Sequence, residues 1–293
     1  MERLRELSRA PHHHPNAVAE EIEAPIVALK QQRPNRGPKK LLELLRRRQP
    51  ARVWPARSTL AAILKRHGLV RSPGRSRKAP PYEHPFARRD RPNAIWSADL
   101  KGWFRTGDGR RCDPLTITDN FSHYLLRCQA VEAPSFKSIQ PVFVGAFHEY
   151  GLLQAIRTDN GPPFTSTTVG GLSRLSIWWL KLGITPECIE LGKPAQNGRH
   201  ERMHRTLKDE AIAPPEANRR RQQAAFDAFR PEFNHQRPHE ALGQRFPEEL
   251  YVPTLSAGDT ANDLSRRYES PPGQNQGDIS WKDHHVYLTS TLA

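Results

Sequence analysis

Residues suited to phosphate chemistry gather between Gly192 and Glu210. Because no helix-breaking residue follows Gly198 for many positions, the stretch predicts a helix. On it the acid Glu201 shares one side with polar and basic residues, whereas Met203 and Leu207 lie opposite and can pack inward. A carboxylate can hold a cation and basic groups can hold a nucleic-acid backbone. A solvated polar face with local ion pairs is the alternative. The shared side comprises Asn197, Glu201, His204, Arg205 and Lys208.

Two aspartates upstream favour the chemical interpretation. Asp99 lies in the middle of Ala-Ile-Trp-Ser-Ala-Asp-Leu-Lys-Gly-Trp-Phe, residues 94–104, which has strand character. Aspartate is disfavoured inside strands, so its presence there indicates a functional or structural role. Asp159 ends a short apolar strand, and Asn160-Gly161-Pro162 forces a turn after it. Each aspartate alone is more commonly a turn cap or an ion-pair partner than a metal ligand.

Taken together, these motifs resemble the integrase core of DDE transposases, the insertion-sequence branch of the retroviral-integrase superfamily. The resemblance spans roughly residues 94 to 250, and its motifs occur in the order of that family. They are Trp-Ser-Ala-Asp-Leu-Lys-Gly at 96–102, Arg-Thr-Asp-Asn-Gly-Pro-Pro-Phe at 157–164, Gln-Asn-Gly-Arg-His-Glu-Arg at 196–202, His-Arg-Thr-Leu-Lys at 204–208 and Asn-His-Gln-Arg-Pro-His-Glu-Ala-Leu-Gly at 234–243.

The resemblance implies that Asp99, Asp159 and Glu201 are the catalytic acids and that they hold two Mg²⁺ or Mn²⁺ ions. It also implies an α/β fold of the RNase H-like type, a mixed five-stranded sheet flanked by helices. In that fold the first and fourth strands are neighbours, so Asp99 and Asp159 should meet at adjacent strand ends, with Glu201 brought over from its helix. Lys208 and Arg205 are expected to position phosphate, and Asn160 and Asn197 to shape the acid-bearing turns. His204, Asn160 and Asn197 are expected to contact DNA as well.

The third acid departs from the usual spacing. Asp159 and Glu201 are 42 positions apart, which is longer than in retroviral integrases. Glu187 and Glu190 lie nearer to Asp159 and remain alternatives. We prefer Glu201, because neither alternative has an Asn-Gly before it and a basic helix after it.

The charge is unevenly distributed. The 293 residues carry a net charge of +14, yet residues 1–90 alone hold 21 lysines and arginines against 8 acids. The remaining residues are therefore close to neutral. A basic block joined to a near-neutral domain indicates a polyanionic partner, of which nucleic acid is the first candidate. The length suggests two or three domains.

Residues 1–70 form a helical region with a helix-turn-helix candidate. Helices are expected over residues 39–48 and 57–67, with Ser58 as a possible N-cap and Gly68 as the stop. Basic residues at their ends favour DNA binding over a purely structural bundle. The resemblance suggests that a preceding helical module is incomplete here. The predicted DNA contacts of this region are Lys39, Lys40, Arg46, Arg47, Arg48, Arg57, Lys65 and Arg66.

The rest of the chain divides into three parts. Residues 71–93 are a basic linker rich in proline and serine, residues 94–250 are the catalytic core, and residues 251–293 are a linker with a partial C-terminal β module. In that last part Ile279, Trp281 and Val286 alternate around a turn and predict a hairpin. Asp119, within the core, is expected to cap a turn rather than to act as a fourth catalytic acid.

The cysteines and the hydropathy of the chain indicate the cellular compartment. Cys112, Cys128 and Cys188 have no paired spacing and are expected to be free thiols. The run His12-His13-His14 has no nearby cysteine pair, so no zinc module is predicted. Without a signal peptide or a membrane-length apolar run, the expected location is the cytoplasm, on the nucleoid if the source is bacterial.

The sequence thus predicts a transposase that cleaves and joins DNA strands with two divalent cations. Its partners would be transposon ends and target DNA, and it would act as a homo-oligomer on DNA, without a small-molecule cofactor. One alternative is a catalytically silent or truncated transposon-derived DNA-binding protein. Another is a metal-dependent nuclease of the same fold, although a nuclease would not need the N-terminal end-binding region.

Overall fold

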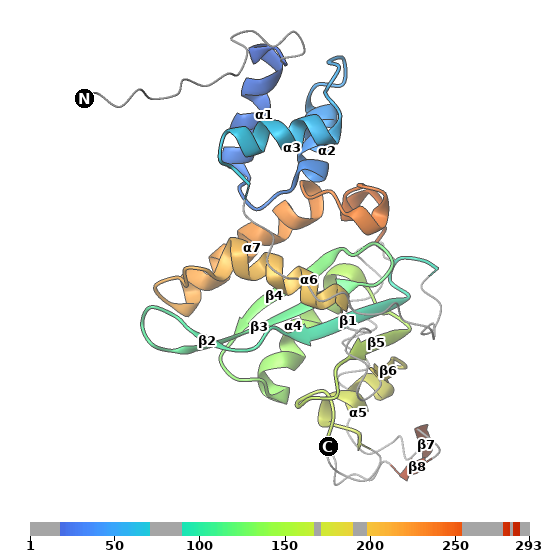
Figure 1. The fold of residues 1–293 in the computed structure, drawn as a ribbon. Coiled ribbons are helices and arrows are strands. Elements are labelled where there is room, and N and C mark those ends of the chain that lie inside the picture. Colours follow the sequence, from blue (N-terminus) through green and yellow to red (C-terminus); the bar gives the residue numbers. More distant parts are fainter. Residues whose placement is uncertain are drawn as a thin grey trace, which may run out of the picture. The chain divides into compact units, whose positions relative to one another are not determined.

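The computed structural model describes residues 18–70, 90–166, 171–189, 198–253, 278–281 and 284–287. The chain divides into two compact units, Met1–Ser76 and Arg77–Ala293, which are considered separately below (Figure 1). Most of the predicted basic linker lies outside the described residues, as do Asn197 and Glu190.

The first unit contains three packed helices, α1 (Glu20–Gln32), α2 (Pro38–Arg48) and α3 (Arg57–Arg66). Their apolar faces meet in one small core, which is what the spacing of leucines in α2 and α3 requires. Lys30 is buried and donates to the carbonyls of Pro34 at 2.6 Å and Arg36 at 2.9 Å, which fixes the turn between α1 and α2. The core side chains are Ile26, Leu29, Leu41, Leu42, Leu44, Leu45, Trp54, Leu60, Ile63 and Leu64.

The two helices predicted as a helix-turn-helix are both present as α2 and α3. Residues 49–56 connect them, a longer link than the three or four residues of a standard helix-turn-helix turn. Trp54 lies buried within this link. The DNA-binding role of the pair therefore stays a prediction.

The second unit is built on a mixed sheet. Its strands are β1 (Ile95–Leu100), β2 (Phe104–Arg105), β3 (Arg111–Asp119), β4 (Leu125–Val131), β5 (Ala155–Thr158) and β6 (Thr185–Cys188). The long strands lie in the order β4-β3-β1-β5-β6, with β2 on the edge of β3. β1 pairs antiparallel with β3 and parallel with β5, and β5 pairs parallel with β6. This order confirms the predicted RNase H-like fold, although the sheet has six strands rather than the predicted five, because the short β2 also pairs with β3.

Helices cover both faces of this sheet (Figure 1). On one face α4 (Phe136–Tyr150) and α5 (Arg174–Lys181) pack on Trp96, Ala98 and Ile117. The other face carries α6 (Gly198–Leu207), the π-helical turn η3 (Lys208–Ile212) and α7 (Arg219–His235) over a second core that contains Met203 and Phe229. Because side chains alternate along a strand, Trp96 and Ala98 face α4, whereas Ser97 and Asp99 face α6.

Short elements follow α7 in the C-terminal part of the second unit. Two 3₁₀ turns, η4 (Glu240–Leu242) and η5 (Pro247–Glu249), follow α7. Farther along, β7 (Asp278–Trp281) and β8 (His284–Tyr287) pair antiparallel as the predicted hairpin. No helix in the described part of the chain is long and apolar enough to span a bilayer.

Candidate active site

Asp99 and Asp159 stand at corresponding positions on neighbouring parallel strands. The β1–β5 register pairs Ser97 with Arg157, and two residues farther along it reaches Asp99 on one strand and Asp159 just beyond the other. Equivalent positions of adjacent strands share a face, which here is the face toward α6. Asp99 is only 7% exposed. The fold therefore creates the neighbouring strand ends that the sequence predicts.

The turn after β5 shapes the second carboxylate. Gly161 donates its backbone N–H to Asp159 Oδ1 at 3.2 Å. A Cβ at Gly161 would lie 3.2 Å from Asp159 Oδ2, so the glycine leaves one side of the carboxylate open. Burial raises the pKa of Asp159, and the Gly161 hydrogen bond opposes that rise. A carboxylate whose charge is poorly solvated gains more from a bound cation than an exposed one does.

Helix α6 is attached to the sheet by two histidine–threonine contacts. His204 Nε2 lies 2.8 Å from Thr116 Oγ1, and His200 Nε2 lies 3.3 Å from Thr118 Oγ1. Both histidines are buried. Together with Met203 and Leu207 they form an inward face with spacing i, i+3, i+4 and i+7. His204 was predicted to share the outer side with Glu201 and to contact DNA, but this packing places it against the sheet instead.

His204 also approaches the first aspartate, since its Nδ1 lies 3.9 Å from Asp99 Oδ2. Burial and the neighbouring charge of Lys101 lower the pKa of His204 to about 4. The imidazole is therefore neutral near pH 7, and its approach to Asp99 is a polar contact rather than an ion pair. We interpret His204 as a residue that positions α6 over Asp99.

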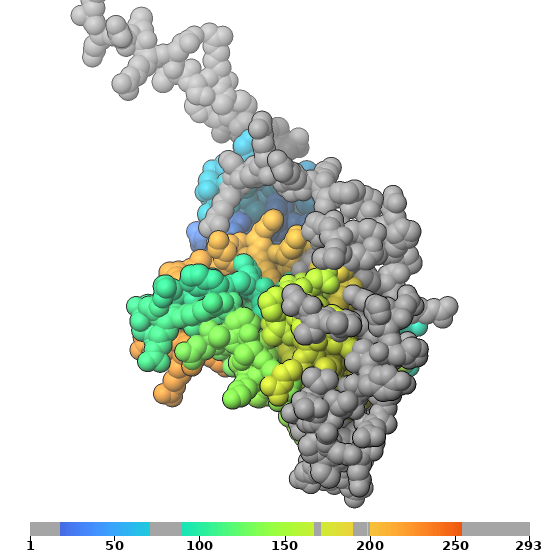
Figure 2. Space-filling view, turned by 90° about the horizontal axis from the view of Figure 1, so that it is seen from below, coloured from blue at the N-terminus to red at the C-terminus, as the bar shows by residue number. Residues whose placement is uncertain are grey.

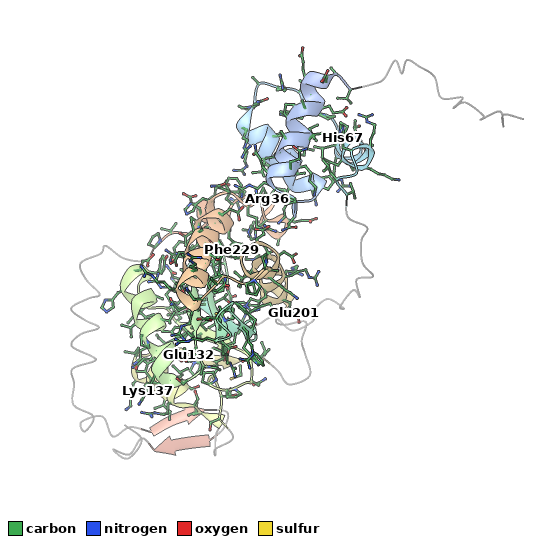
Figure 3. The ribbon with its side chains drawn as sticks, turned by 90° about the vertical axis from the view of Figure 1, so that its left-hand side faces the viewer. Arg36, His67, Glu132, Lys137, Glu201 and Phe229 are labelled. Atoms are coloured by element: carbon green, nitrogen blue, oxygen red, sulfur yellow. The ribbon has the colours of Figure 1, made fainter. Side chains whose placement is uncertain are left out.

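Glu201 is exposed, on the outward side of α6, and Figure 3 shows it at the margin of the core. Among the residues that the structure describes, no group of three acidic, histidine or cysteine side chains is spaced to hold a metal ion. The structure thus brings Asp99 and Asp159 to neighbouring strand ends without adding Glu201 to them. The physical reason is the helix rotation, because Glu201 follows the inward-facing His200 by one residue, about 100° around the helix.

One alternative third acid is already engaged. Glu187 Oε2 accepts hydrogen bonds from Arg157 Nη2 at 2.8 Å and Nε at 3.2 Å. The arginine side chain is only 5% exposed, so releasing Glu187 would leave a buried guanidinium without this partner. Glu190, the other alternative, lies outside the described residues.

The remaining predicted contacts fall into two groups. Asn160 donates its side-chain amide to the carbonyl of Ile189, and its own carbonyl accepts from Thr165, so it links parts of the turn after β5, while its contact with DNA stays a prediction. Most of the predicted basic residues are exposed, and Lys40 is half-buried. Arg47 pairs with Glu43 at 2.8 Å, and Arg66 pairs with Glu23. The exposed ones are Arg205, Lys208, Lys39, Arg46, Arg47, Arg48, Arg57, Lys65 and Arg66.

The donors present fit a hard divalent cation. Asp99 and Asp159 offer only carboxylate oxygens, which Mg²⁺ and Mn²⁺ prefer, and the Gly161 turn leaves one side of Asp159 open. Two carboxylates are fewer ligands than a two-ion site uses.

Asp119 is a structural acid, as predicted. Its carboxylate accepts from Asn93 N at 2.9 Å, Ser122 N at 2.7 Å and Ser122 Oγ at 2.6 Å. The residue is completely buried. Burial raises its pKa, and these hydrogen bonds oppose the rise. It therefore ties the start of the core to the β3–β4 turn.

Asp119→Ala is expected to destabilise the core by roughly 3 kcal/mol or more, because three buried donors lose their acceptor. The measurement is the urea midpoint of the full chain followed by tryptophan fluorescence. Glu132→Gln is the control (Glu132 is labelled in Figure 3). This acid is exposed and pairs with Arg219 at the surface, so the midpoint of the variant should hardly change. A stable Asp119→Ala variant that had lost activity would instead make Asp119 a catalytic acid.

Comparison with known proteins identifies the family. Two family models, each described as an integrase core domain, match residues 89–194 and 182–247 and together cover more than half of the chain. The chain belongs to the integrase core family. The matched residues include β1 and β5, so the strands that position Asp99 and Asp159 lie within the integrase core.

Two insertion-element proteins are similar to this integrase-core chain. It is 30% identical over 174 residues to the insertion element IS407 uncharacterized 31.7 kDa protein of Burkholderia multivorans, a match over 57% of this chain and 58% of that protein. It is 27% identical over 259 residues to the insertion element IS476 uncharacterized 39.2 kDa protein of Xanthomonas euvesicatoria, over 85% of this chain and 70% of that one.

Two solved structures are also similar in outline. The HTLV-2 integrase catalytic core domain in complex with magnesium matches with a TM-score of 0.44 and 17% identity, over 56% of this chain and 100% of that chain. The simian T-cell lymphotropic virus intasome in complex with PP2A regulatory subunit B56 gamma matches with a TM-score of 0.48 and 17% identity, over 79% and 76%.

Sequence reasoning missed the two inward histidine contacts and the Arg157–Glu187 pair. His200 and His204 are four residues apart and flank Met203, so the spacing of an inward face was visible. The inward face was missed because histidine is polar, and His204 was therefore assigned to the same side of the helix as the charged residues. The pairing of Arg157 with Glu187 depends on β5 and β6 being neighbours, which no short motif records.

Proposed function

We propose that this integrase-core protein cleaves and joins DNA strands during transposition of an insertion element. The observation that carries the proposal is the placement of Asp99 and Asp159 at corresponding ends of adjacent parallel strands. Similarity to insertion-element proteins supports transposition as the setting. The substrates would be the element's own DNA ends and a target DNA, and the reaction would take place in the cytoplasm.

In this proposal Asp99, Asp159 and Glu201 hold two Mg²⁺ or Mn²⁺ ions. Bound ions of this kind supply an activated oxygen nucleophile and stabilise the leaving oxygen in phosphoryl transfer. Glu201 would join the aspartates only after a rearrangement at the start of α6. Arg205 and Lys208, exposed along the same helix, would contact the DNA backbone and favour that rearrangement.

A working complex would contain at least two copies. Each chain carries one set of acids, whereas transposition joins two element ends to one target. The basic N-terminal unit would bind an end, and a neighbouring copy's core would act on it. Avidity between linked units would then stabilise an oligomer that is weak in the absence of DNA.

The test is a joining reaction with the full chain, duplex oligonucleotides from the ends of its element and a supercoiled plasmid target. Joined product is expected with Mg²⁺ or Mn²⁺ and is expected to be lost on chelation with EDTA and restored by excess Mg²⁺. Gel separation of labelled ends measures it. Product that persists in EDTA would contradict the proposed metal dependence.

A second candidate function follows from the outward position of Glu201. If the third acid never reaches the aspartates, the protein binds element ends without cutting them. The same reaction separates the two candidates: end binding without any joined or cleaved product, in either metal, would favour the silent DNA-binding protein. Cleavage of DNA irrespective of end sequence, without joining, would favour a nuclease.

A further inference from the structure

An exposed tryptophan, Trp103, lies shortly after β1, the strand that carries Asp99. Trp103 follows β1 by three residues and is 54% exposed, and it is one of four exposed large apolar side chains in the described part of the chain. Gly102, just before it, has a φ of +88°, a backbone conformation that favours glycine. Trp103 is four positions after Asp99, so their Cα atoms are within about 14 Å of each other.

Two arginines make cation–π contacts with the indole of Trp103. The guanidinium carbons of Arg111 and Arg105 lie 5.3 Å and 5.7 Å from the Trp103 ring centre. Arg111 donates from Nε at 2.7 Å to the buried Asp113, and Arg105 donates from Nη1 at 2.7 Å to the carbonyl of Gly109. The arginines are therefore anchored on the protein, yet more than half of the tryptophan remains open.

The β2–β3 hairpin, which carries Arg105 and Arg111, is itself held by hydrogen bonds to the segment before α7. The N–H groups of Gly107 and Asp108 donate to the carbonyls of Glu216 and Ala217 at 2.9 Å and 2.8 Å. The hairpin, coloured teal, lies at the rim of the core in the space-filling view (Figure 2). A platform on this hairpin is thus preorganised, and little conformational entropy would be lost when it binds a ligand.

Local charge selects the kind of ligand. Residues 101–113 contain four basic side chains and two acids. Asp108 accepts from Thr106 Oγ1 at 2.5 Å and from the N–H of Arg110 at 3.2 Å, and Asp113 pairs with Arg111. Residues 91–293 as a whole carry almost no net charge, so this hairpin is a concentrated positive site within a near-neutral unit. An aromatic face beside guanidinium groups suits a base and its phosphates.

We propose that Trp103, Arg105 and Arg111 form a platform on which an unpaired base of the DNA strand stacks next to the cleavage site. A duplex shows its base edges in the grooves while stacking covers most of its base faces, so an unpaired base can lie on the indole far more readily than a paired one. The platform would hold the frayed strand end while its phosphate lies at Asp99. The assignment to the strand near the cut rests on the proposed function; stacking itself does not.

The test measures binding without metal, using the full chain in EDTA. The probes are a blunt duplex and the same duplex with a three-nucleotide unpaired end containing 2-aminopurine, whose fluorescence is quenched by stacking. Trp103→Ala should weaken binding of the unpaired end by roughly 5- to 100-fold, the range of one base–aromatic stack, and should abolish the quenching. Trp103→Phe should retain most of both, and blunt-duplex affinity should change less than about twofold.

Val252→Ala is the matched control, because Val252 is another exposed apolar residue of the same unit, and both probes should bind it normally. Equal weakening of both probes by Trp103→Ala, or unchanged quenching, would overturn the platform. The readout does not depend on strand joining. If the wild-type chain stacks the base through Trp103 yet never joins strands, the proposed function fails and the platform stands.

Discussion

Asp99→Asn and Asp159→Asn are each expected to reduce DNA strand joining by about a thousandfold or more, while end binding stays nearly normal. Asparagine keeps the size of the side chain but removes the charge that holds a divalent cation. Metal stabilisation of phosphoryl transfer is worth several kcal/mol, and about 4 kcal/mol corresponds to a thousandfold in rate. End binding should persist because we assign it chiefly to the basic N-terminal unit.

The measurement is the amount of joined product per active complex, with end binding followed in parallel by gel shift. Asp227→Asn is a matched control in the same unit, since this exposed α7 carboxylate only accepts a hydrogen bond from Gln223 at 2.9 Å. It should join strands at the wild-type rate. Normal joining by Asp99→Asn would show that the paired strand ends are not the active site.

The third acid is tested in the same reaction. Glu201→Gln should lose joining to the same extent as the aspartate variants, whereas Glu187→Gln should lose stability through its buried partner Arg157 and keep joining in the fraction that folds. Glu190→Gln should be active. If Glu190→Gln is inactive and Glu201→Gln is active, our choice of Glu201 is wrong.

The strand arrangement around Asp99 and Asp159 was predictable because it depends on local patterns. Apolar runs broken by Asn-Gly-Pro or by Gly-Asp-Gly mark where strands begin and end. Their order then leaves few topologies, since sequential strands usually pair and parallel crossovers need a helix. The register that places Asp99 level with Asp159 follows from that topology, not from either motif alone.

The orientation of α6 was harder to predict. A helical wheel assigns residues to sides by polarity, and His200 and His204 look polar. In the fold they face Thr116 and Thr118 of β3, more than 80 positions away in the sequence, and this contact makes two polar residues part of the interior. Glu201 consequently turns outward, which no periodicity in the helix itself reveals.

Removing residues 1–90 is expected to weaken end binding by about a thousandfold near physiological salt. This segment holds 21 of the 45 lysines and arginines and nearly all of the net charge. Binding through phosphates releases counterions, and each neutralised phosphate adds about 0.9 to the slope of log affinity against log salt concentration. If about six phosphates are contacted there, the slope should fall by about 5 in the truncated chain.

Point variants locate the effect within the N-terminal unit. Arg46 and Arg48 are exposed at the end of α2, whereas Arg47 between them bonds to Glu43 at 2.8 Å. The double variant Arg46→Ala/Arg48→Ala should therefore lower the salt slope by about 2. Arg47→Ala should change the slope less, because that guanidinium already has an acidic partner that competes with phosphate.

The measurement is the fluorescence anisotropy of a labelled element end, titrated with protein at several salt concentrations. It compares the full chain, the two α2 variants and a fragment spanning residues 94 to 250. Retained affinity and an unchanged slope in the fragment would place end binding in the core and remove the role proposed for the first unit. A lower slope in the α2 variants, with core stability intact, would instead show that the N-terminal unit contributes electrostatic attraction. In that case the N-terminal unit binds the DNA end, and the carboxylates of the core act in strand joining.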